Sequence, residues 1–385
     1  MSEYLPGLAG VPATKSNISD IDGEKGILAY RGYDIQELAE KSTFEETALL
    51  LLDGELPSAA SLEEFDHQLR GERKLKYNVR EIMKNLPATG HPMEMLQTAI
   101  AAMGMFYKGS KVLTEGYGQE DEYYVHSMSV KIIARVATIV AAWQHVRNGY
   151  DPIDPRRDLN HSENFMYMMT GLEPDPLTAR IMDACLIMHA EHTINASTFA
   201  AMVCASTLAG PFRVIAAAIG TLAGPLHGGA NQRVVEMLEE IGRPENVRDW
   251  LEMKLEEKEV IWGMGHREYK TKDPRAIILQ KMVLEWADKK GDLSPMFETA
   301  LELERQCEEI LGPKGVYPNV DYYSGILYSE MGIPSDQFTP IFAVSRIAGW
   351  MAHWKEQLSD NRIFRPTQIY TGHPPRDYVP IDQRG

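Results

Sequence analysis

The chain has 385 residues, of which 44% are hydrophobic and 24% charged, and its formal net charge is −16 at pH 7. This length exceeds one ordinary core and predicts two domains, or one large domain with a smaller attachment. The negative charge argues against nucleic acid or an anionic membrane as the main partner. An anionic substrate would therefore need a local cationic pocket.

The predicted elements begin with strands at residues 15–33, where two short runs flank Asp22-Gly23, a favoured hairpin turn. Helical patterns dominate afterwards. Thr43 and Glu46 have the spacing of a capping box. Residues 92–107, 126–148, 177–208 and 212–223 show helical spacing or are apolar nearly all round. We predict an all-α, mostly helical protein with one small β-hairpin near the N-terminus.

The patterning changes twice in the second half of the chain. From Ala230 to about Gly312 the predicted helices are shorter and more charged, and after Thr339 the sequence is strongly apolar again. This change predicts a large domain made of residues 1–224 and 333–385, with a small domain, residues 225–332, inserted between them. His227 would lie at their junction, where substrate clefts commonly form.

The cysteines, the N-terminus and the apolar segments indicate where in the cell the protein is expected. Cys185 and Cys204 sit in apolar surroundings, which favours reduced thiols and a cytoplasmic protein. The first ten residues show no signal-peptide pattern. The best candidate for a membrane span, residues 214–226, is too short to cross a bilayer, so we expect a buried core helix there and no membrane partner.

The segment HAEH places His189 and His192 one helical turn apart. The zinc-binding helix pattern needs a spacing of four with a glutamate after the first histidine, so we expect no metal. A hydrogen-bonded core histidine is the alternative for His189. The polar run after His192 favours a cleft there.

In the segment GMGH, Gly263 and Gly265 permit tight backbone before His266. No strand-to-helix dinucleotide fingerprint accompanies them, which excludes a Rossmann site. In the following DPRA, Asp273 is a predicted N-cap. Arg275 then lies in a first helical turn, a sensible place for a cation only if an anion binds there. A solvated arginine is the open alternative.

Two further residues have competing interpretations. Arg346 lies among apolar residues in a helix predicted to be capped by Thr339, so it needs a ligand anion or a distant carboxylate, and we favour the ligand. Asp321 is either the N-cap of the next helix or a general base with a raised pKa. The sequence has no nucleophile elbow and no P-loop. The histidines, the arginines and Asp321 together favour proton abstraction next to a carbonyl.

Taken in order, SDIDGEKGILAYRGY, HAEHTINAST, GPLHGGANQ, GMGHREYKTKDPRA, PNVDYYSG, SRIAGWMAH and RIFRPTQIYTG resemble the citrate synthase family along nearly the whole chain. The resemblance implies a mostly helical, two-domain dimer that closes over its substrates. It also implies condensation of acetyl-CoA with oxaloacetate and hydrolysis of citryl-CoA. Acetyl-CoA would be the co-substrate, with no metal and no permanently bound cofactor.

Each motif implies a role. Asp321 would remove a methyl proton from acetyl-CoA, His227 would hydrogen-bond the thioester oxygen, and His266 would polarise the oxaloacetate carbonyl and act as the acid. His192, Arg275 and Arg346 would hold oxaloacetate, and Arg365 would reach the active site of the partner in a homodimer. The implied CoA-binding residues are Ile261, Gly263, Met264, Gly265, Lys270, Lys314 and Asn319.

Three alternatives stay open at this point. A 2-methylcitrate synthase would use propionyl-CoA on the same framework, a difference of only about 1–3 kcal/mol in pocket discrimination. A metal-dependent hydrolase could use His189, Glu191 and His192. A non-catalytic helical scaffold is the third.

Overall fold

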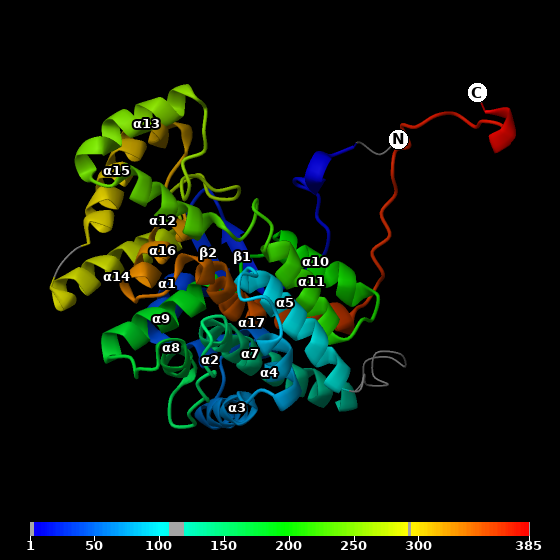
Figure 1. Cartoon of the computed structure of the whole chain (residues 1–385), viewed down its shortest axis with the longest axis horizontal. Coiled ribbons are helices and arrows are strands. Elements are labelled where there is room, and N and C mark those ends of the chain that lie inside the picture. Colours follow the sequence, from blue (N-terminus) through cyan, green and yellow to red (C-terminus); the bar gives the residue numbers. More distant parts are fainter. Residues whose placement is uncertain (1–3, 108–118, 292–293, 385) are drawn as a thin grey trace.

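A computed structural model describes residues 4–107, 119–291 and 294–384, with the backbone alone for 119–121. The fold is mostly helical, as predicted (Figure 1). The helices of the first half are α1 Ile35–Lys41, α2 Phe44–Asp53, α3 Ala59–Glu72, α4 Tyr77–Lys84, α5 Pro92–Met103, α7 Gln119–Val146, α8 His161–Thr170 and α9 Pro176–His189. Those of the second half are α10 Ala196–Ser206, α11 Pro211–Leu222, α12 Ala230–Ile241, α13 Val247–Glu256, α14 Pro274–Lys290, α15 Pro295–Leu311, α16 Val320–Glu330 and α17 Phe338–Ser359.

The predicted hairpin is present and belongs to an antiparallel sheet in the order β1 (Ser19–Asp22), β2 (Ile27–Tyr30), β3 (Tyr33–Asp34). The third strand was not predicted. The hairpin turn is also longer than the two-residue turn predicted at Asp22-Gly23, because it spans residues 23–26. The Asp22 carboxylate accepts a hydrogen bond from the Lys25 amide at 3.1 Å and so closes the longer turn.

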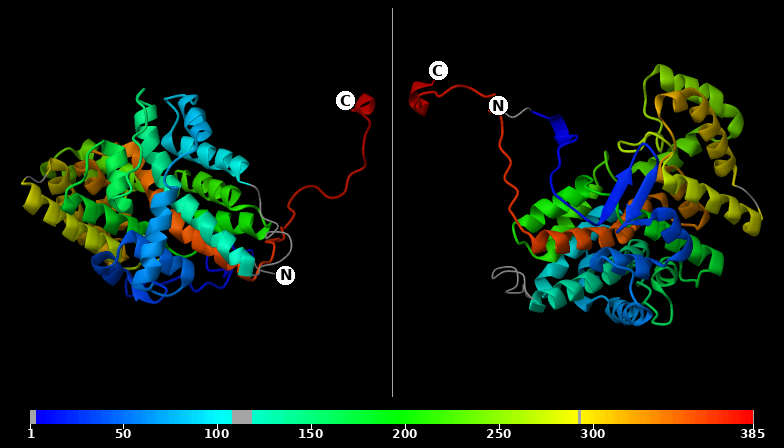
Figure 2. Two further views of the ribbon diagram at one scale, coloured as in Figure 1. Left: turned by 90° about the horizontal axis from the view of Figure 1, so that it is seen from below. Right: turned by 180° about the vertical axis from the view of Figure 1, so that it is seen from behind.

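Helix α17 is the centre of the core. It packs against α2, α7, α9, α10 and α11, and residues 338–354 are all buried. A helix that is apolar on every side needs neighbours on every side, which explains this central place. Helices α12, α14, α15 and α16 pack on one another, and Figures 1 and 2 show them with α13 as a group beside the helices around α17. The exact division into domains at residues 225 and 332 stays a prediction.

Among the described residues, the apolar helix long enough to cross a membrane is α7, whereas the sequence offered residues 214–226 as the best candidate for a span. By length and composition Glu122–Val146 could cross a membrane, but 83% of its apolar window is buried inside the protein. Packing in the core therefore accounts for its apolar character. Residues 214–222 lie in α11, another largely buried helix.

Two predicted caps differ from the structure. Thr43 caps α2 by accepting from the Glu46 amide at 3.2 Å, but the Glu46 carboxylate accepts from the Ser42 hydroxyl instead of completing the capping box. Thr339 is not a cap at all, because α17 already begins at Phe338. Its hydroxyl donates to the Gly228 carbonyl oxygen at 3.0 Å, which ties α17 to the loop that carries His227.

Candidate active site

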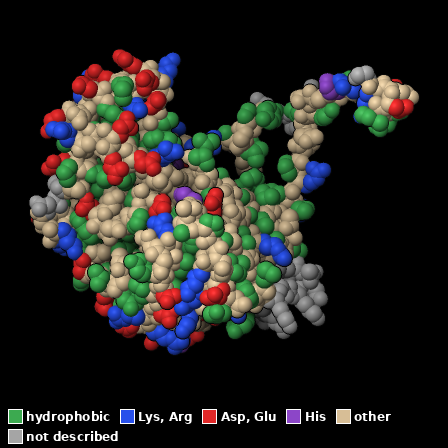
Figure 3. All heavy atoms as spheres, in the orientation of Figure 1, with side chains coloured by type: hydrophobic (Ala, Val, Ile, Leu, Met, Phe, Trp, Pro, Cys, Tyr) green, Lys and Arg blue, Asp and Glu red, His purple; other side chains and the backbone are tan. Residues whose placement is uncertain are grey.

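A cavity of about 1060 Å³ lies where the α12–α16 group meets the helices around α17. In Figure 3, histidine side chains are visible where this face is hollowed. The structure brings six predicted residues together as its lining: His192, His227, His266, Arg275, Asp321 and Arg346. They come from six places in the chain between residues 192 and 346, so only the tertiary fold makes them neighbours.

Asp321 is not the N-cap of α16. Asn319 takes that position, and its side chain accepts from the Asp321 amide at 2.9 Å. Asp321 therefore lies in the first turn, and its buried Oδ1 has no hydrogen-bond partner among the described residues. Burial raises the pKa of Asp321 to about 6, because the charged form loses water that no donor replaces. This carboxylate is available as a base near neutral pH.

His227 is held as a neutral ring of defined tautomer. The Ser197 amide, near the start of α10, donates to Nε2 of His227 at 3.2 Å, and the Ser197 hydroxyl lies 2.8 Å from the same nitrogen. Because Nε2 accepts, the proton must be on Nδ1. Burial lowers the pKa of His227 to about 4. His227 can therefore offer one N–H donor to a ligand without carrying charge.

His266 has the opposite tautomer. Its Nδ1 accepts from the amides of Glu268 at 3.0 Å and Tyr269 at 3.4 Å, so Nε2 carries the proton. Burial, followed by the positive charge of Arg275, lowers the pKa of His266 to about 4. Gly265, with φ at +83°, provides the left-handed turn just before the histidine. A second neutral N–H donor thus belongs to the cavity.

His192 and Arg275 are both buried, with exposures of 8% and 2%. Nε2 of His192 lies 3.1 Å from the Tyr269 hydroxyl, and its ring centroid is 5.0 Å from that of His266. Arg275 forms an ion pair with Asp273 at 2.7 Å, so the alternative of a solvated arginine is wrong. Asp273 is the predicted N-cap of α14, and it accepts from the Arg275 amide at 2.9 Å.

Arg346 is 2% exposed, and its Nε donates to the His189 carbonyl oxygen at 2.7 Å. Burial lowers the pKa of Arg346 to about 10, and the negative charge of Glu191 is the largest effect that opposes this shift. The distant carboxylate left open by the sequence is therefore Glu191, itself 0% exposed. The two side chains make no direct ion pair, which leaves the guanidinium in the cavity lining able to bind an anion.

Two side chains that a metal-dependent hydrolase would use as metal ligands, His189 and Glu191, have hydrogen-bond partners in the protein. Nδ1 of His189 lies 2.8 Å from the Cys185 carbonyl oxygen, as expected of a core histidine. Glu191 is bound by the Ser19 hydroxyl and by His353. Among the described residues no three histidine, cysteine or acidic side chains form a group able to hold a metal ion.

The predicted CoA-binding residues lie beside the cavity rather than in its lining. Met264 forms an isolated β-bridge with Pro318, and the Asn319 side chain donates to the Gly265 carbonyl oxygen at 2.8 Å. Lys270 and Lys314 are exposed on adjacent loops, since Gly315 lies against the Lys270 carbonyl oxygen. The remaining predicted residues, Ile261 and Gly263, are buried behind the same loop.

Arg365 is the one predicted site residue that the chain keeps away from its own cavity. It lies exposed on the segment after α17, and its Nη1 donates to the Pro366 carbonyl oxygen at 3.0 Å. Figures 1 and 2 show this segment running away from the body of the protein.

The sequence interpretation missed Ser197, Tyr269 and the segment of residues 7–14, which lines part of the cavity. Ser197 and Tyr269 lie inside the motifs NAST and HREYK. Their position close in sequence to predicted site residues was the only indication that they belong to the site. Residues 7–14 contain no charged side chain, so nothing in their sequence indicated that they belong to the site.

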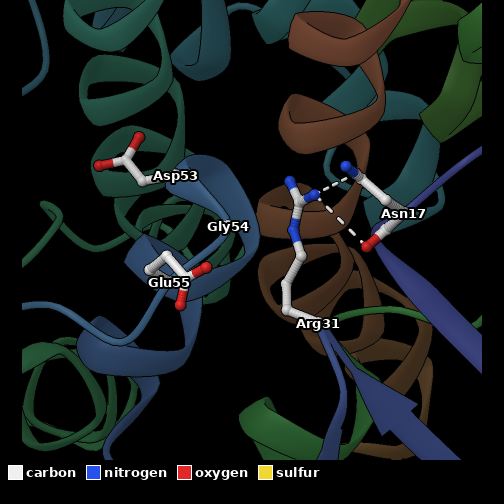
Figure 4. A pocket seen from close by; sticks show the side chains of 5 residues that line it. All are labelled: Asn17, Arg31, Asp53, Gly54 and Glu55. Carbon is white, nitrogen blue, oxygen red and sulfur yellow. Dashed lines mark hydrogen bonds between the residues drawn. The ribbon is translucent and has the colours of Figure 1, made fainter.

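A second, smaller cavity of about 390 Å³ is lined by Asn17, Arg31, Asp53, Gly54 and Glu55 (Figure 4). The Arg31 guanidinium hydrogen-bonds Asn17 and the Leu51 carbonyl oxygen, and Asp53 pairs with Lys355 at 3.0 Å. These contacts join the N-terminal segment to α2 and α17, and no predicted site residue takes part in them.

Comparisons with known proteins show the family of the chain. Residues 7–367 match the family model described as "Citrate synthase, C-terminal domain". The chain is 59% identical to a citrate synthase of Acidithiobacillus ferridurans over 99% of this chain and 98% of the relative. It is 53% identical to a citrate synthase of Synechocystis over 99% and 94%.

Solved structures give the same result. A citrate synthase of Pyrobaculum aerophilum superposes with a TM-score of 0.93 at 42% identity, covering 98% of this chain and 95% of that one. A citrate synthase of Thermoplasma acidophilum, solved as a ternary complex with carboxymethyl coenzyme A and oxaloacetate, has a TM-score of 0.93 at 31% identity, with both chains covered completely.

Proposed function

The chain belongs to the citrate synthase family and therefore condenses acetyl-CoA with oxaloacetate, and we propose that Asp321, His227 and His266 carry out this chemistry. One observation carries the assignment. The cavity holds a half-buried carboxylate with an unpaired oxygen and two neutral histidines of opposite, defined tautomers. A Claisen-type condensation needs one base and two hydrogen-bond donors, one for each reacting carbonyl.

Oxaloacetate would be held by His192, Arg275 and Arg346. Guanidinium groups bind carboxylates through paired, charge-assisted hydrogen bonds. In a chain of net charge −16, these buried arginines form the local cationic pocket that a dianion requires. Arg275 is held in place by Asp273, so this part of the pocket is ordered before substrate binds.

The proton transfers follow from the tautomers. Asp321 takes a proton from the acetyl methyl group, while Nδ1–H of His227 donates to the thioester oxygen as it becomes an enol or enolate. The methylene carbon then forms a bond to the keto carbon of oxaloacetate, and Nε2–H of His266 supplies a proton to the keto oxygen. Water then cleaves the thioester of citryl-CoA, which releases citrate and CoA.

CoA would lie along the loop beside the cavity. Ile261, Gly263, Met264, Gly265 and Asn319 would form its wall, and the exposed ammonium groups of Lys270 and Lys314 would meet its phosphates. The family uses acetyl-CoA as a substrate, and we propose that no cofactor is permanently bound. The two-domain division would allow closure over the substrates, which keeps an enolate and a thioester from bulk water.

A homodimer with Arg365 at the partner's active site completes the proposal. Ile363, Ile369 and Tyr370 are 64–71% exposed on the same extended segment. Apolar side chains on a segment that leaves the body of the protein are typical of a surface covered by a partner. We also propose a cytoplasmic location, where Cys185, Cys204 and Cys307, all unpaired, would stay reduced.

The test is a steady-state assay of CoA release with acetyl-CoA and with propionyl-CoA. The relatives described above are citrate synthases and give no support to a 2-methylcitrate synthase. We expect kcat/KM for acetyl-CoA to exceed that for propionyl-CoA by at least tenfold, which is about 1.4 kcal/mol of discrimination. A preference for propionyl-CoA would overturn the assignment.

A further inference from the structure

His192 lies in the tight turn of residues 190–195 between α9 and α10. The residue after it, Thr193, has a φ of +50°, a left-handed conformation that β-branched residues rarely adopt. Such a conformation persists only where surrounding contacts hold it. The contacts that hold this turn therefore decide where the His192 ring stands.

Ser19 of β1 binds both chain neighbours of His192. Its hydroxyl accepts from the Thr193 amide at 3.1 Å and donates to Oε1 of Glu191 at 3.0 Å. The Ser19 side chain, 172 positions away in the sequence from Glu191, thus connects the residue before His192 to the residue after it. Neither bond involves the His192 ring, which lines the cavity and whose Nε2 lies 3.1 Å from the Tyr269 hydroxyl.

Tyr30 of β2 holds the same turn from the same face of the sheet. Ser19 and Tyr30 are paired residues in the antiparallel register of β1 and β2, so their side chains project to one side. The Tyr30 hydroxyl accepts from the Glu191 amide at 3.1 Å and donates to the Glu191 carbonyl oxygen at 2.8 Å. The hydroxyl is fully buried, so water does not compete for these bonds.

The sheet also touches the second loop of the site. The Gly23 carbonyl oxygen, in the turn between β1 and β2, accepts from the Lys270 amide at 2.9 Å. A Cβ at Gly23 would lie 2.1 Å from the Glu268 carbonyl oxygen, so this close approach requires glycine. Glu268 is one of the two residues whose amides orient His266.

We propose that Ser19 and Tyr30 are positioning residues for oxaloacetate binding, and that the N-terminal sheet exists to hold the turn of His192 in its binding conformation. This inference rests on the proposed function of His192. Neither residue lines the cavity, so both act through Glu191 and Thr193 and not by contact with substrate.

The test is the dissociation constant of oxaloacetate, measured by calorimetry on the full chain. Ser19→Ala removes both bonds without changing any charge, and we expect Kd to rise about tenfold, the effect of losing one to two hydrogen bonds. Ser19→Thr keeps a hydroxyl and should restore Kd to within about threefold of the wild type. The KM for acetyl-CoA at saturating oxaloacetate should stay within twofold in both variants.

Ser16→Ala is the matched control. Ser16 lies three residues earlier in the same segment, and within the described part of the chain its hydroxyl accepts only from the Ile18 amide, at 3.3 Å. It should leave Kd unchanged. Tyr30→Phe is a second variant should Ser19→Ala fail to fold, and it should raise Kd in the same direction.

The outcomes separate the two proposals. Wild-type protein that does not bind oxaloacetate would refute the proposed function. Wild-type binding with an unchanged Kd in Ser19→Ala and Tyr30→Phe, even with a lowered melting temperature, would show a merely structural sheet and overturn the inference.

Discussion

The Asn319 side chain accepts a hydrogen bond from the Asp321 amide at 2.9 Å, and this contact relieves Asp321 of the capping role that its position invites. An aspartate that caps a helix is held ionised by amide donors and is a poor base. Asp321 instead keeps a buried oxygen without a partner and a pKa raised to about 6. A neighbouring residue two positions away has thus made the carboxylate available for chemistry.

Asp321→Asn should lower kcat by at least about 10²-fold, because positioned bases contribute roughly 10²- to 10⁴-fold. The amide keeps the shape of the side chain, so Kd for oxaloacetate should stay within about twofold. Asp249→Asn is the control, since Asp249 lies in the first turn of α13 and is exposed. It should have wild-type kcat. Substantial turnover by Asp321→Asn would contradict the assignment of the base.

The pH profile of kcat/KM for acetyl-CoA should show an acid limb near pH 6. The base must be ionised, so the rate should fall about tenfold per unit as pH drops below the pKa of Asp321. His227 and His266, with pKa values lowered to about 4, stay neutral throughout and add no limb above pH 5. Rates measured from pH 4.5 to 9 test this, and an apparent pKa at the ordinary aspartate value would count against it.

The ionised Asp321 carboxylate should lower the free energy of unfolding at neutral pH. Its folded pKa lies above the unfolded value of 3.8, so its contribution is fully present below pH 3.8 and is lost as pH rises through about 6. Asp321→Asn should therefore increase the free energy of unfolding at pH 8 by about 2 kcal/mol, allowing for its partial exposure. Urea unfolding at pH 8 and at pH 4.5 measures this difference, which should shrink at the lower pH. An equal effect at both values would argue against the raised pKa.

Arg365→Ala should weaken oxaloacetate binding at least tenfold, because a charge-assisted contact to the substrate is lost. At an oxaloacetate concentration too low to fill the weakened sites, Arg365→Ala subunits combined with inactive Asp321→Asn subunits in one dimer should recover up to half of the wild-type activity. In that dimer one site has both Asp321 and an intact Arg365 from its partner. Heterodimers isolated with two different affinity tags provide the assay. Inactive heterodimers of verified composition would rule out a shared site.

Gly349→Ala should disturb the turn of His192 from the opposite side. A Cβ at Gly349 would lie 2.3 Å from both the Ala190 carbonyl oxygen and Oε2 of Glu191. Overpacking of this kind costs about 1–3 kcal/mol, and we expect a matching loss of stability with a raised Kd for oxaloacetate. Gly71→Ala in α3 is the control, because a Cβ there meets nothing within 4 Å. It should be neutral or slightly stabilising, by up to about 1 kcal/mol. Equal melting temperatures for the two variants would contradict the close packing at Gly349.

Local patterns predicted some, but not all, of the contacts between residues that are near in the chain. Asp273 caps α14 as predicted, because an N-cap needs only amides two or three positions on. Thr339 and Asp321 were wrongly weighed as caps, because Gln337 and Asn319 lie where the helices begin. The four-residue turn escaped prediction because its Gly23 is held by contact with residues 268–270, far along the chain.

By itself, the sequence determined the helical class, the N-terminal strands and the residue types of the site, since these follow from periodicity, capping and motif spacing. The resemblance of the motifs to one family then named the reaction. Only the tertiary structure decided which nitrogen of His227 carries a proton, that the negative charge of Glu191 acts on Arg346, and that Ser19 supports the turn of His192. The physical reason is distance along the chain. Tautomers, pKa values and strained turns depend on partners that folding brings from up to 174 positions away, and no local pattern records them.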